Sequence, residues 1–155
     1  MGQTSLLARV ESAFPELTFE QSDDFRWSPS DQTVYVGRLV TDRDLITLLH
    51  EIGHALAGHN GYSKDIELLA LEREAWTIAH DQIAPKFAIT ITEDLIEEAL
   101  DSYRDWLHAR SRCPECTQNG IQRSIDTYTC LLCTASWRVN DARTCGLKRY
   151  RLATH

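Results

Sequence analysis

The sequence contains no apolar run approaching the roughly 20 residues that a membrane-spanning helix requires. Its opening stretch, MGQTSLLARVESAF, lacks the basic segment and the long apolar segment of a secretory signal peptide. Leu6 also stands where N-myristoylation requires serine or threonine. These absences argue against membrane and secreted classes, and they predict a cytoplasmic, unprocessed protein without a membrane partner.

Cysteine is absent from the first 112 residues, and all five cysteines follow. Two Cys-x-x-Cys pairs, Cys113/Cys116 and Cys130/Cys133, are separated by thirteen residues. In a chain without a secretory leader, such pairs indicate a metal site rather than disulfides. Their spacing predicts a zinc ribbon, in which four thiolates hold one structural zinc ion. Redox use of the pairs is the alternative.

The segment between the two pairs, TQNGIQRSIDTYT, predicts a β-hairpin with Asn119 and Gly120 as its turn. A ribbon of about 40 residues buries little apolar surface. Zinc would therefore contribute most of the folding free energy of this segment.

Positive charge is scarce before residue 110. Residues 1–109 carry 8 Lys and Arg against 20 Asp and Glu, whereas residues 110–155 carry 8 against 3, which gives the totals of 16 and 23. A chain of 155 residues can bury one core and carry a small appended module. We predict an acidic domain over 1–110 and a basic ribbon and tail over 111–155. This tail could bind nucleic acid or an acidic partner, or its charges could merely be solvated. Its basic residues are Arg110, Arg112, Arg123, Arg138, Arg143, Lys148, Arg149 and Arg151.

The apolar pattern predicts an α+β fold. Apolar and polar residues alternate over 17–29 and 31–40, which predicts a small antiparallel sheet. One strand is expected at 33–36. This strand could pair with an extended substrate, or it could be an ordinary strand of the sheet.

Apolar residues at helical spacing predict four helices, over 4–14, 41–58, 63–84 and 93–110. Thr41, Ser63 and Thr92 are the expected N-caps, because their hydroxyls can accept a backbone N–H of the first turn. Pro85 is expected to stop the helix that begins near Ser63. The stripe expected to be buried in the helix after Thr41 consists of Leu45, Leu48, Leu49, Ile52 and Leu56.

The same helix carries two histidines four residues apart. The run His50-Glu51-Ile52-Gly53-His54 fits the zincin pattern His-Glu-x-x-His. Residues four apart lie one turn apart, so both imidazoles can reach one zinc ion at about 2.0 to 2.1 Å. Glu51 lies about 100° around the helix, where it would serve as general base.

A catalytic zinc ion needs a third protein ligand and an open fourth position. Metzincins have glycine three and histidine six residues after the second histidine, whereas Gly58 and His59 follow His54 by four and five. We therefore expect His59 to be a helix-end or loop residue. Glu72 lies inside the apolar arc of the next helix, where a buried carboxylate requires a cation. Glu74 lies outside that arc, but it stands about as far from His54 as the glutamate of thermolysin-like enzymes stands from their second histidine, so it remains the alternative.

The run HEIGHALAGH followed by LEREAWTIAHDQIAP resembles the ImmA/IrrE group of small metallo-endopeptidases over about residues 33–85. The second motif of that group runs Glu-x-x-Ala-Asn-x-Phe-Ala and ends with proline. Trp76 stands where the group has asparagine, and Ile78 stands where it has phenylalanine. If that asparagine steadies a zinc ligand, something else must do so here. The motif positions are occupied by Glu72, Ala75, Ile78, Ala79 and Pro85.

The resemblance implies a minimal zincin-like domain of the gluzincin type, with His50, His54 and Glu72 as zinc ligands and Glu51 as base. It implies a zinc-dependent endopeptidase that acts on a protein or peptide, such as a regulator. With the ribbon, the chain would hold two zinc ions, one catalytic and one structural. Candidate donors for an oxyanion, by residue type alone, are Tyr62, Tyr103, Arg104 and His108.

Two other functions remain open. SprT-like proteins also join a His-Glu-x-x-His domain to a zinc ribbon and act near DNA, although their third ligand is usually histidine. Alternatively, the zincin-like body is a degenerate scaffold and the ribbon is a binding module. Cys145 could cap the catalytic zinc ion and keep the enzyme latent, but a lone cysteine is more commonly a small buried residue.

Overall fold

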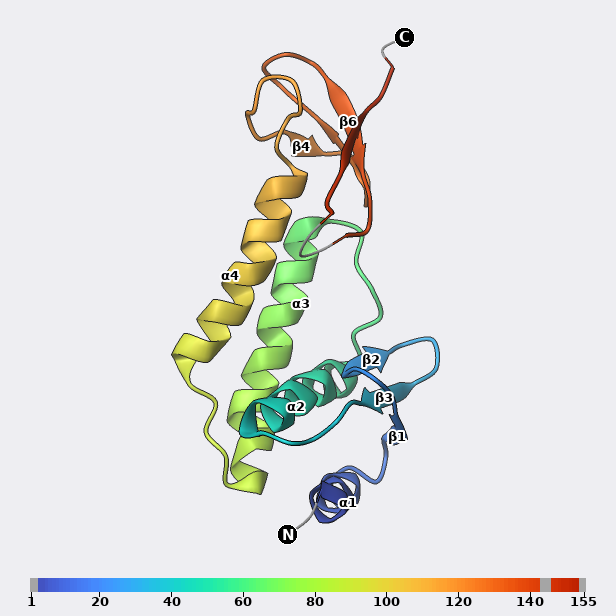
Figure 1. Ribbon diagram of the computed structural model, residues 1–155, viewed down its shortest axis with the longest axis vertical. Coiled ribbons are helices and arrows are strands. Elements are labelled where there is room, and N and C mark those ends of the chain that lie inside the picture. The colour runs from blue at the N-terminus through green and yellow to red at the C-terminus, as the bar shows by residue number, and fades with distance from the viewer. Residues whose placement is uncertain (1–2, 143–145, 154–155) are drawn as a thin grey trace. The chain divides into compact units, whose positions relative to one another are not determined.

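The computed structural model describes residues 3–142 and 146–153 (Figure 1). This part of the chain is α+β, with four α-helices and two small sheets, in which the strand orders are β1-β3-β2 and β4-β5-β6-β7. No helix within it is both long and apolar enough to cross a membrane.

The described residues divide into two compact units. The first unit comprises the residues up to Gly61 together with Ala70–Ile96. The second comprises Tyr62–Leu69 and the residues from Glu97 onward. The predicted ribbon segment therefore lies within the second unit, where it is accompanied by parts of two helices.

The sheet of the first unit follows the helix α1 (Gln3–Ala13) and consists of β1 (Thr18–Gln21), β2 (Arg26–Ser28) and β3 (Thr33–Val36). β2 and β3 form the predicted antiparallel hairpin. β1, however, pairs with β3 in parallel, so the prediction of a wholly antiparallel sheet is wrong. β3 is the central strand and is paired on both sides, which leaves no free edge for a substrate to join.

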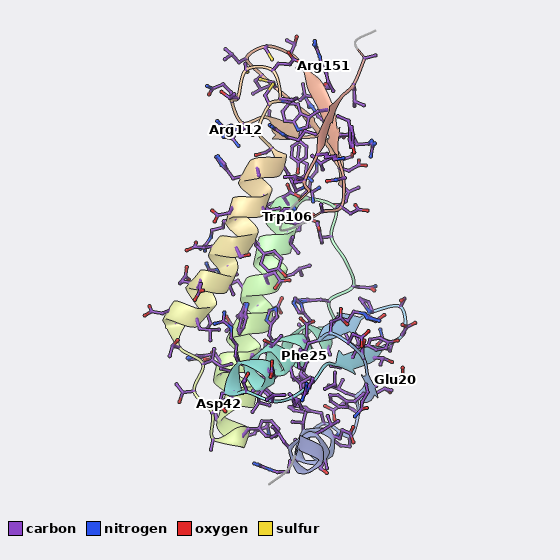
Figure 2. All side chains as sticks on the ribbon, viewed as in Figure 1. Glu20, Phe25, Asp42, Trp106, Arg112 and Arg151 are labelled. Atoms are coloured by element: carbon purple, nitrogen blue, oxygen red, sulfur yellow. The ribbon has the colours of Figure 1, made fainter. Side chains whose placement is uncertain are left out.

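Gly37 leaves room for the segment that connects β1 to β2. A Cβ atom at Gly37 would lie 3.1 Å from Cε2 of Phe25 and 3.2 Å from the carbonyl carbon of Asp24. The connection between β1 and β2 thus passes close against the end of β3, with Phe25 (labelled in Figure 2) over the glycine. Because the connection crosses there, β1 and β2 lie on opposite sides of β3.

The helix α2 (Asp42–Ala57) has the predicted ends. The Thr41 hydroxyl accepts the N–H of Asp44, and the Asp44 carboxylate accepts the N–H of Thr41, which is a complete capping box. At the other end Gly58 adopts the left-handed conformation, with φ of 70°. The predicted stripe is buried except for Leu56, which is 39% exposed, so burial ends one turn before the helix does.

The helix α3 (Asp65–Ile78) is shorter than predicted at both ends. The Leu68 N–H bonds to the carbonyl of Lys64 at 3.3 Å, so Lys64 and not Ser63 is the N-cap. The Glu67 carboxylate accepts the N–H groups of Ser63 and Lys64 at 2.8 and 3.2 Å. After Ile78 the chain continues as one π-helical turn, η1 (Ala79–Ile83), and a 3-10 turn, η2 (Ala84–Phe87). Pro85 lacks an N–H and would clash with the preceding turn, so a regular α-helix cannot pass through it.

The helix α4 (Glu93–Arg110) begins and ends where predicted, and the Thr92 hydroxyl accepts the N–H of Leu95 at 3.2 Å. In the second unit, Leu68 of α3 packs with Trp106 and Leu107 of α4. The Trp106 indole donates a hydrogen bond to the carbonyl of Ala142 (Figure 2).

The ribbon sheet consists of β4 (Ile121–Gln122), β5 (Thr127–Thr129), β6 (Ser136–Val139) and β7 (Arg149–Arg151). The hairpin between the cysteine pairs is present, but its turn spans 123–126, so the prediction of a turn at Asn119 and Gly120 is wrong. Gly120 is needed for packing instead. A Cβ atom there would lie 2.6 Å from Cη2 of Trp137.

Two residues of the ribbon core make hydrogen bonds to the ends of α3 and α4 in the second unit. Tyr128 and Trp137 are fully buried and stacked, with ring centroids 5.7 Å apart. The Trp137 indole donates to the carbonyl of Arg110 at 2.9 Å, and the Tyr128 hydroxyl donates to the carboxylate of Asp65. The described residues of the ribbon therefore contact the ends of both helices through Trp137 and Tyr128.

In the first unit α2 crosses α3 (Figure 1), and their backbones come close together at Gly53. A Cβ atom at Gly53 would lie only 2.4 Å from the carbonyl oxygen of Ala75. Glu72 precedes Ala75 by one turn, and His50 precedes Gly53 by one turn. The missing side chain at Gly53 therefore lets the carboxylate of α3 approach the histidine of α2.

Replacing Gly53 by alanine should destabilise the protein. In an ordinary helix interior Gly→Ala stabilises by about 0.5 to 1 kcal/mol, but here the added methyl group would overlap the Ala75 carbonyl. We expect a loss of about 1 to 3 kcal/mol in the free energy of unfolding, as for other overpacked cores. Urea unfolding of Gly53→Ala and wild type measures this difference, and a stabilised variant would contradict the close packing.

Candidate metal centres

The imidazoles of His50 and His54 converge with the carboxylate of Glu72 in the first unit. The two Nε2 atoms lie 3.2 Å apart. Glu72 presents one oxygen to each: Oε2 lies 2.8 Å from His50 Nε2, and Oε1 lies 3.3 Å from His54 Nε2. We name this group the histidine site, and it could bind a metal ion.

The separations within the histidine site suit a tetrahedral ion. Ligand atoms at 2.0 to 2.1 Å from zinc stand about 3.3 Å apart at the tetrahedral angle. The three separations here are 2.8, 3.2 and 3.3 Å. Two unprotonated Nε2 atoms at 3.2 Å would direct their lone pairs at each other, which favours a cation or a proton between them.

The structure brings Glu72, and not Glu74, to the two histidines. Glu72 is only 5% exposed. Burial alone would raise its pKa, but the hydrogen bonds and charges of His50 and His54 outweigh burial and hold the pKa well below its usual range. Hydrogen bonding to the two imidazoles thus favours the charged carboxylate, and a bound cation would favour it in the same way. The assignment of these residues as ligands stays a prediction.

Glu51 lies beside the histidine site and is partly buried. Its Oε2 accepts the backbone N–H of Trp27, in β2, at 2.9 Å. Burial raises the pKa of the Glu51 carboxyl above its usual value, and the charges of His50 and His54 offset this only in part. An acidic side chain held in a partly desolvated position is typical of a group that exchanges protons.

The ring of Trp76 covers His50. The two rings are stacked at a centroid distance of 4.2 Å and an angle of 21°. Nδ1 of His50 and Nε1 of Trp76 are buried, and neither has a hydrogen-bond partner among the described residues. Trp76, which stands in place of the expected asparagine, therefore supports His50 by stacking and not by a hydrogen bond.

His59 lies just after the end of α2, as predicted, and its side chain also lies beside the histidine site, which was not predicted. The N–H groups of Gly58 and His59 bond to the carbonyls of Ala55 and His54, the two bonds of a Schellman motif. This turn folds His59 back so that its Nδ1 lies 2.8 Å from Nδ1 of His54. His59 Nε2 in turn lies 2.9 Å from Oε2 of Glu74. The position of His59 could have been predicted from Gly58, because a glycine that ends a helix in a Schellman motif returns the next residue to the last helical turn.

The four ribbon cysteines also converge and could bind a metal ion; we name them the cysteine site. The Sγ atoms of Cys113 and Cys133 lie 3.6 Å apart, and those of Cys116 and Cys130 lie 3.4 Å apart. A disulfide would bring two sulfurs to about 2.05 Å, whereas tetrahedral zinc would hold them about 3.8 Å apart. Backbone N–H groups, that of Cys133 first, lower the pKa of Cys130 to about 7, which favours the thiolate that zinc requires.

The basic residues of the tail have unequal surroundings. Arg110 is buried and donates to the carbonyl of Ile125 at 2.6 Å, so it cannot belong to a basic binding surface. Arg138 lies over the ring of Tyr150 at 5.0 Å, and Arg151 pairs with Glu115 at 3.0 Å. Arg143 and Cys145 lie outside the described residues.

Comparison with known proteins adds no assignment. No model of a protein family matches the chain, and no curated protein or solved structure is significantly similar to it. The two candidate metal centres are therefore the features from which function must be argued.

The Glu51→Gln variant should be more stable than wild type when the histidine site holds no metal. Because folding raises the pKa of Glu51, its ionised form costs stability as the pH rises above the ordinary value of 4.5, and the cost is complete above the raised pKa. The gain should therefore be present near pH 7 and absent near pH 4. Urea unfolding at both pH values, in the same chelating buffer, measures it.

Glu98→Gln is the matched control, because Glu98 is exposed on α4. Its free energy of unfolding should follow that of wild type at both pH values. A Glu51→Gln variant no more stable than this control near pH 7 would show that the folded protein does not disfavour the charge on Glu51.

Proposed function

We propose that the protein is a zinc-dependent endopeptidase whose active site is the histidine site. The observation that supports this most strongly is the buried convergence of His50, His54 and Glu72 with Glu51 beside them. Two histidines and one glutamate with a neighbouring acidic base are the donor set of a gluzincin-type hydrolytic centre.

The number of ligands supports a catalytic rather than a structural ion. Within the described residues the histidine site offers three protein ligands, whereas the cysteine site offers four. Structural zinc sites are closed by four protein ligands, and catalytic sites keep one position for water or substrate. Glu51 adds to this contrast, because a structural site has no use for a further, partly buried carboxylate with a raised pKa.

The proposed reaction is hydrolysis of a peptide bond by water. Zinc bound at the site would polarise the peptide carbonyl and lower the pKa of the attacking water. Glu51 accepts the proton of that water and then delivers it to the nitrogen of the leaving amine. The raised pKa of Glu51 suits transfer in both directions, and the Trp27 N–H fixes the orientation of the carboxylate by holding its Oε2.

The ribbon would hold the second, structural zinc ion and recruit a substrate or an acidic or nucleic-acid partner. The SprT-like alternative calls for a histidine as third ligand. His59 is the nearest in sequence, and its imidazole is engaged by Nδ1 of His54 and by Glu74. That engagement favours the glutamate-ligated enzyme over the alternative.

Glu51→Gln should abolish cleavage without loss of zinc. The amide keeps the shape of the side chain but cannot accept the proton, so the rate should fall by about 10²- to 10⁴-fold. Zinc-loaded wild type, Glu51→Gln and the control Glu98→Gln are incubated with a defined peptide pool, and new termini are counted by mass spectrometry. Zinc content is measured in the same samples.

The proposal expects the same new termini from wild type and Glu98→Gln, and few or none from Glu51→Gln with its zinc retained. Equal cleavage by wild type and Glu51→Gln would contradict it. A zinc-loaded wild type that yields no new termini would instead favour the binding-protein alternative.

A further inference from the structure

A chain of three side chains leads from the histidine site to the protein surface. His54 Nδ1 meets His59 Nδ1 at 2.8 Å, and His59 Nε2 meets Glu74 Oε2 at 2.9 Å. The His59 side chain is 8% exposed, whereas that of Glu74 is 56% exposed. The Trp27 indole donates to the carbonyl of His59 at 2.9 Å and so anchors its backbone. The chain is continuous and held from both strand and helix.

If His54 binds a metal ion, the direction of each hydrogen bond between His54, His59 and Glu74 follows. His54 directs Nε2 at His50 and Glu72, so Nε2 must be unprotonated to bind a cation. A neutral His54 then carries its proton on Nδ1 and donates it to Nδ1 of His59. His59 must therefore carry its own proton on Nε2, which donates to the ionised carboxylate of Glu74. One arrangement of protons satisfies all three groups.

We propose that His59 and Glu74 form a positioning relay that holds His54 in the tautomer and orientation required for zinc binding. This inference rests on the metal site of the proposed function. Ligand histidines commonly donate their second N–H to a carboxylate or carbonyl. Here the acceptor is another imidazole, which is itself polarised by a carboxylate.

The relay grows out of the way α2 ends. In a Schellman motif the residue after the glycine returns to the last helical turn, where an apolar contact usually forms. In this protein the two residues that meet are His59 and His54, and their rings are edge to face with centroids 5.1 Å apart. Two apolar residues at these positions would be sufficient to end the helix, so the presence of two histidines indicates a role beyond capping.

The other histidine of the site has no such support. His50 is held by the stacked ring of Trp76, and its Nδ1 has no hydrogen-bond partner among the described residues. Orientation of the ligands by hydrogen bonding therefore depends on the relay at His54. Loss of the relay should weaken zinc binding by about 10- to 100-fold, the range for removal of such supporting partners.

The test measures zinc affinity of the histidine site in the full chain, by competition with a chromophoric chelator while the ribbon zinc is retained. The variants are His59→Leu, His59→Asn, Glu74→Gln and the double variant His59→Leu/Glu74→Gln. His80→Leu is the matched control, because His80 also pairs with a carboxylate, that of Asp81 at 2.6 Å, outside the relay. Thermal unfolding of each variant in chelator reports its fold separately from its zinc affinity.

The relay predicts a graded series of affinities. His59→Leu should bind zinc about 10- to 100-fold more weakly than wild type. His59→Asn should recover part of this loss of zinc affinity. The asparagine amide oxygen can replace Nδ1 of His59 as the acceptor from His54, but the shorter side chain cannot reach Glu74. Glu74→Gln should weaken binding by a smaller factor and should add nothing in the His59→Leu background, since Glu74 acts only through His59. His80→Leu should match wild type.

Zinc affinity of His59→Leu within a factor of two of wild type would overturn the relay, as would an undiminished effect of Glu74→Gln in the His59→Leu background. If His59→Leu does not fold, Glu74→Gln alone decides, and unchanged affinity in that variant overturns the relay. A wild type that binds zinc only at the cysteine site overturns the relay and the proposed function together. Tight binding by wild type and all variants overturns the relay alone.

Discussion

The close backbone approach of α2 to α3 at Gly53 is the constraint on which the candidate active site depends. Only a residue without a side chain allows the Ala75 carbonyl so near to the helix that carries both histidines. One helical turn away, that approach delivers the carboxylate of Glu72 to His50 and His54. Gly53 lies inside the His-Glu-x-x-His run, so the segment that carries both histidines and Glu51 also provides the space in which Glu72 approaches them.

The two candidate metal centres differ in the number of ligand groups that they offer and in the residues that surround them. The cysteine site is closed by four thiol groups and belongs to a core that includes Tyr128 and Trp137. The histidine site offers three possible ligands and contains groups that are costly to bury, including Glu72 and Nδ1 of His50, which has no hydrogen-bond partner among the described residues. Functional sites commonly carry such costs, whereas purely structural regions avoid them. This difference is the physical basis of the proposal that catalysis takes place at the histidine site.

Local signals in the sequence were sufficient for the ends of α2 and α4 and for the grouping of the four cysteines, but not for the ends of α3. Thr41 and Gly58 delimit α2 because capping depends on neighbouring residues only. Features that depend on packing between distant segments were not predictable. The role of Gly120 is set by contact with Trp137 across the sheet, and the pairing of His59 with Glu74 requires two helices to meet. Periodicity describes one element at a time and contains neither relation.

The central claim is that the chain holds two zinc ions in separate sites. Elemental analysis of the purified protein tests it directly, applied to wild type, His50→Ala and Cys113→Ser/Cys116→Ser. The account predicts two zinc ions per chain in wild type, one from each group, and one in each variant. A single zinc ion in wild type that is unaffected by His50→Ala would contradict it, because the histidine site would then hold no metal.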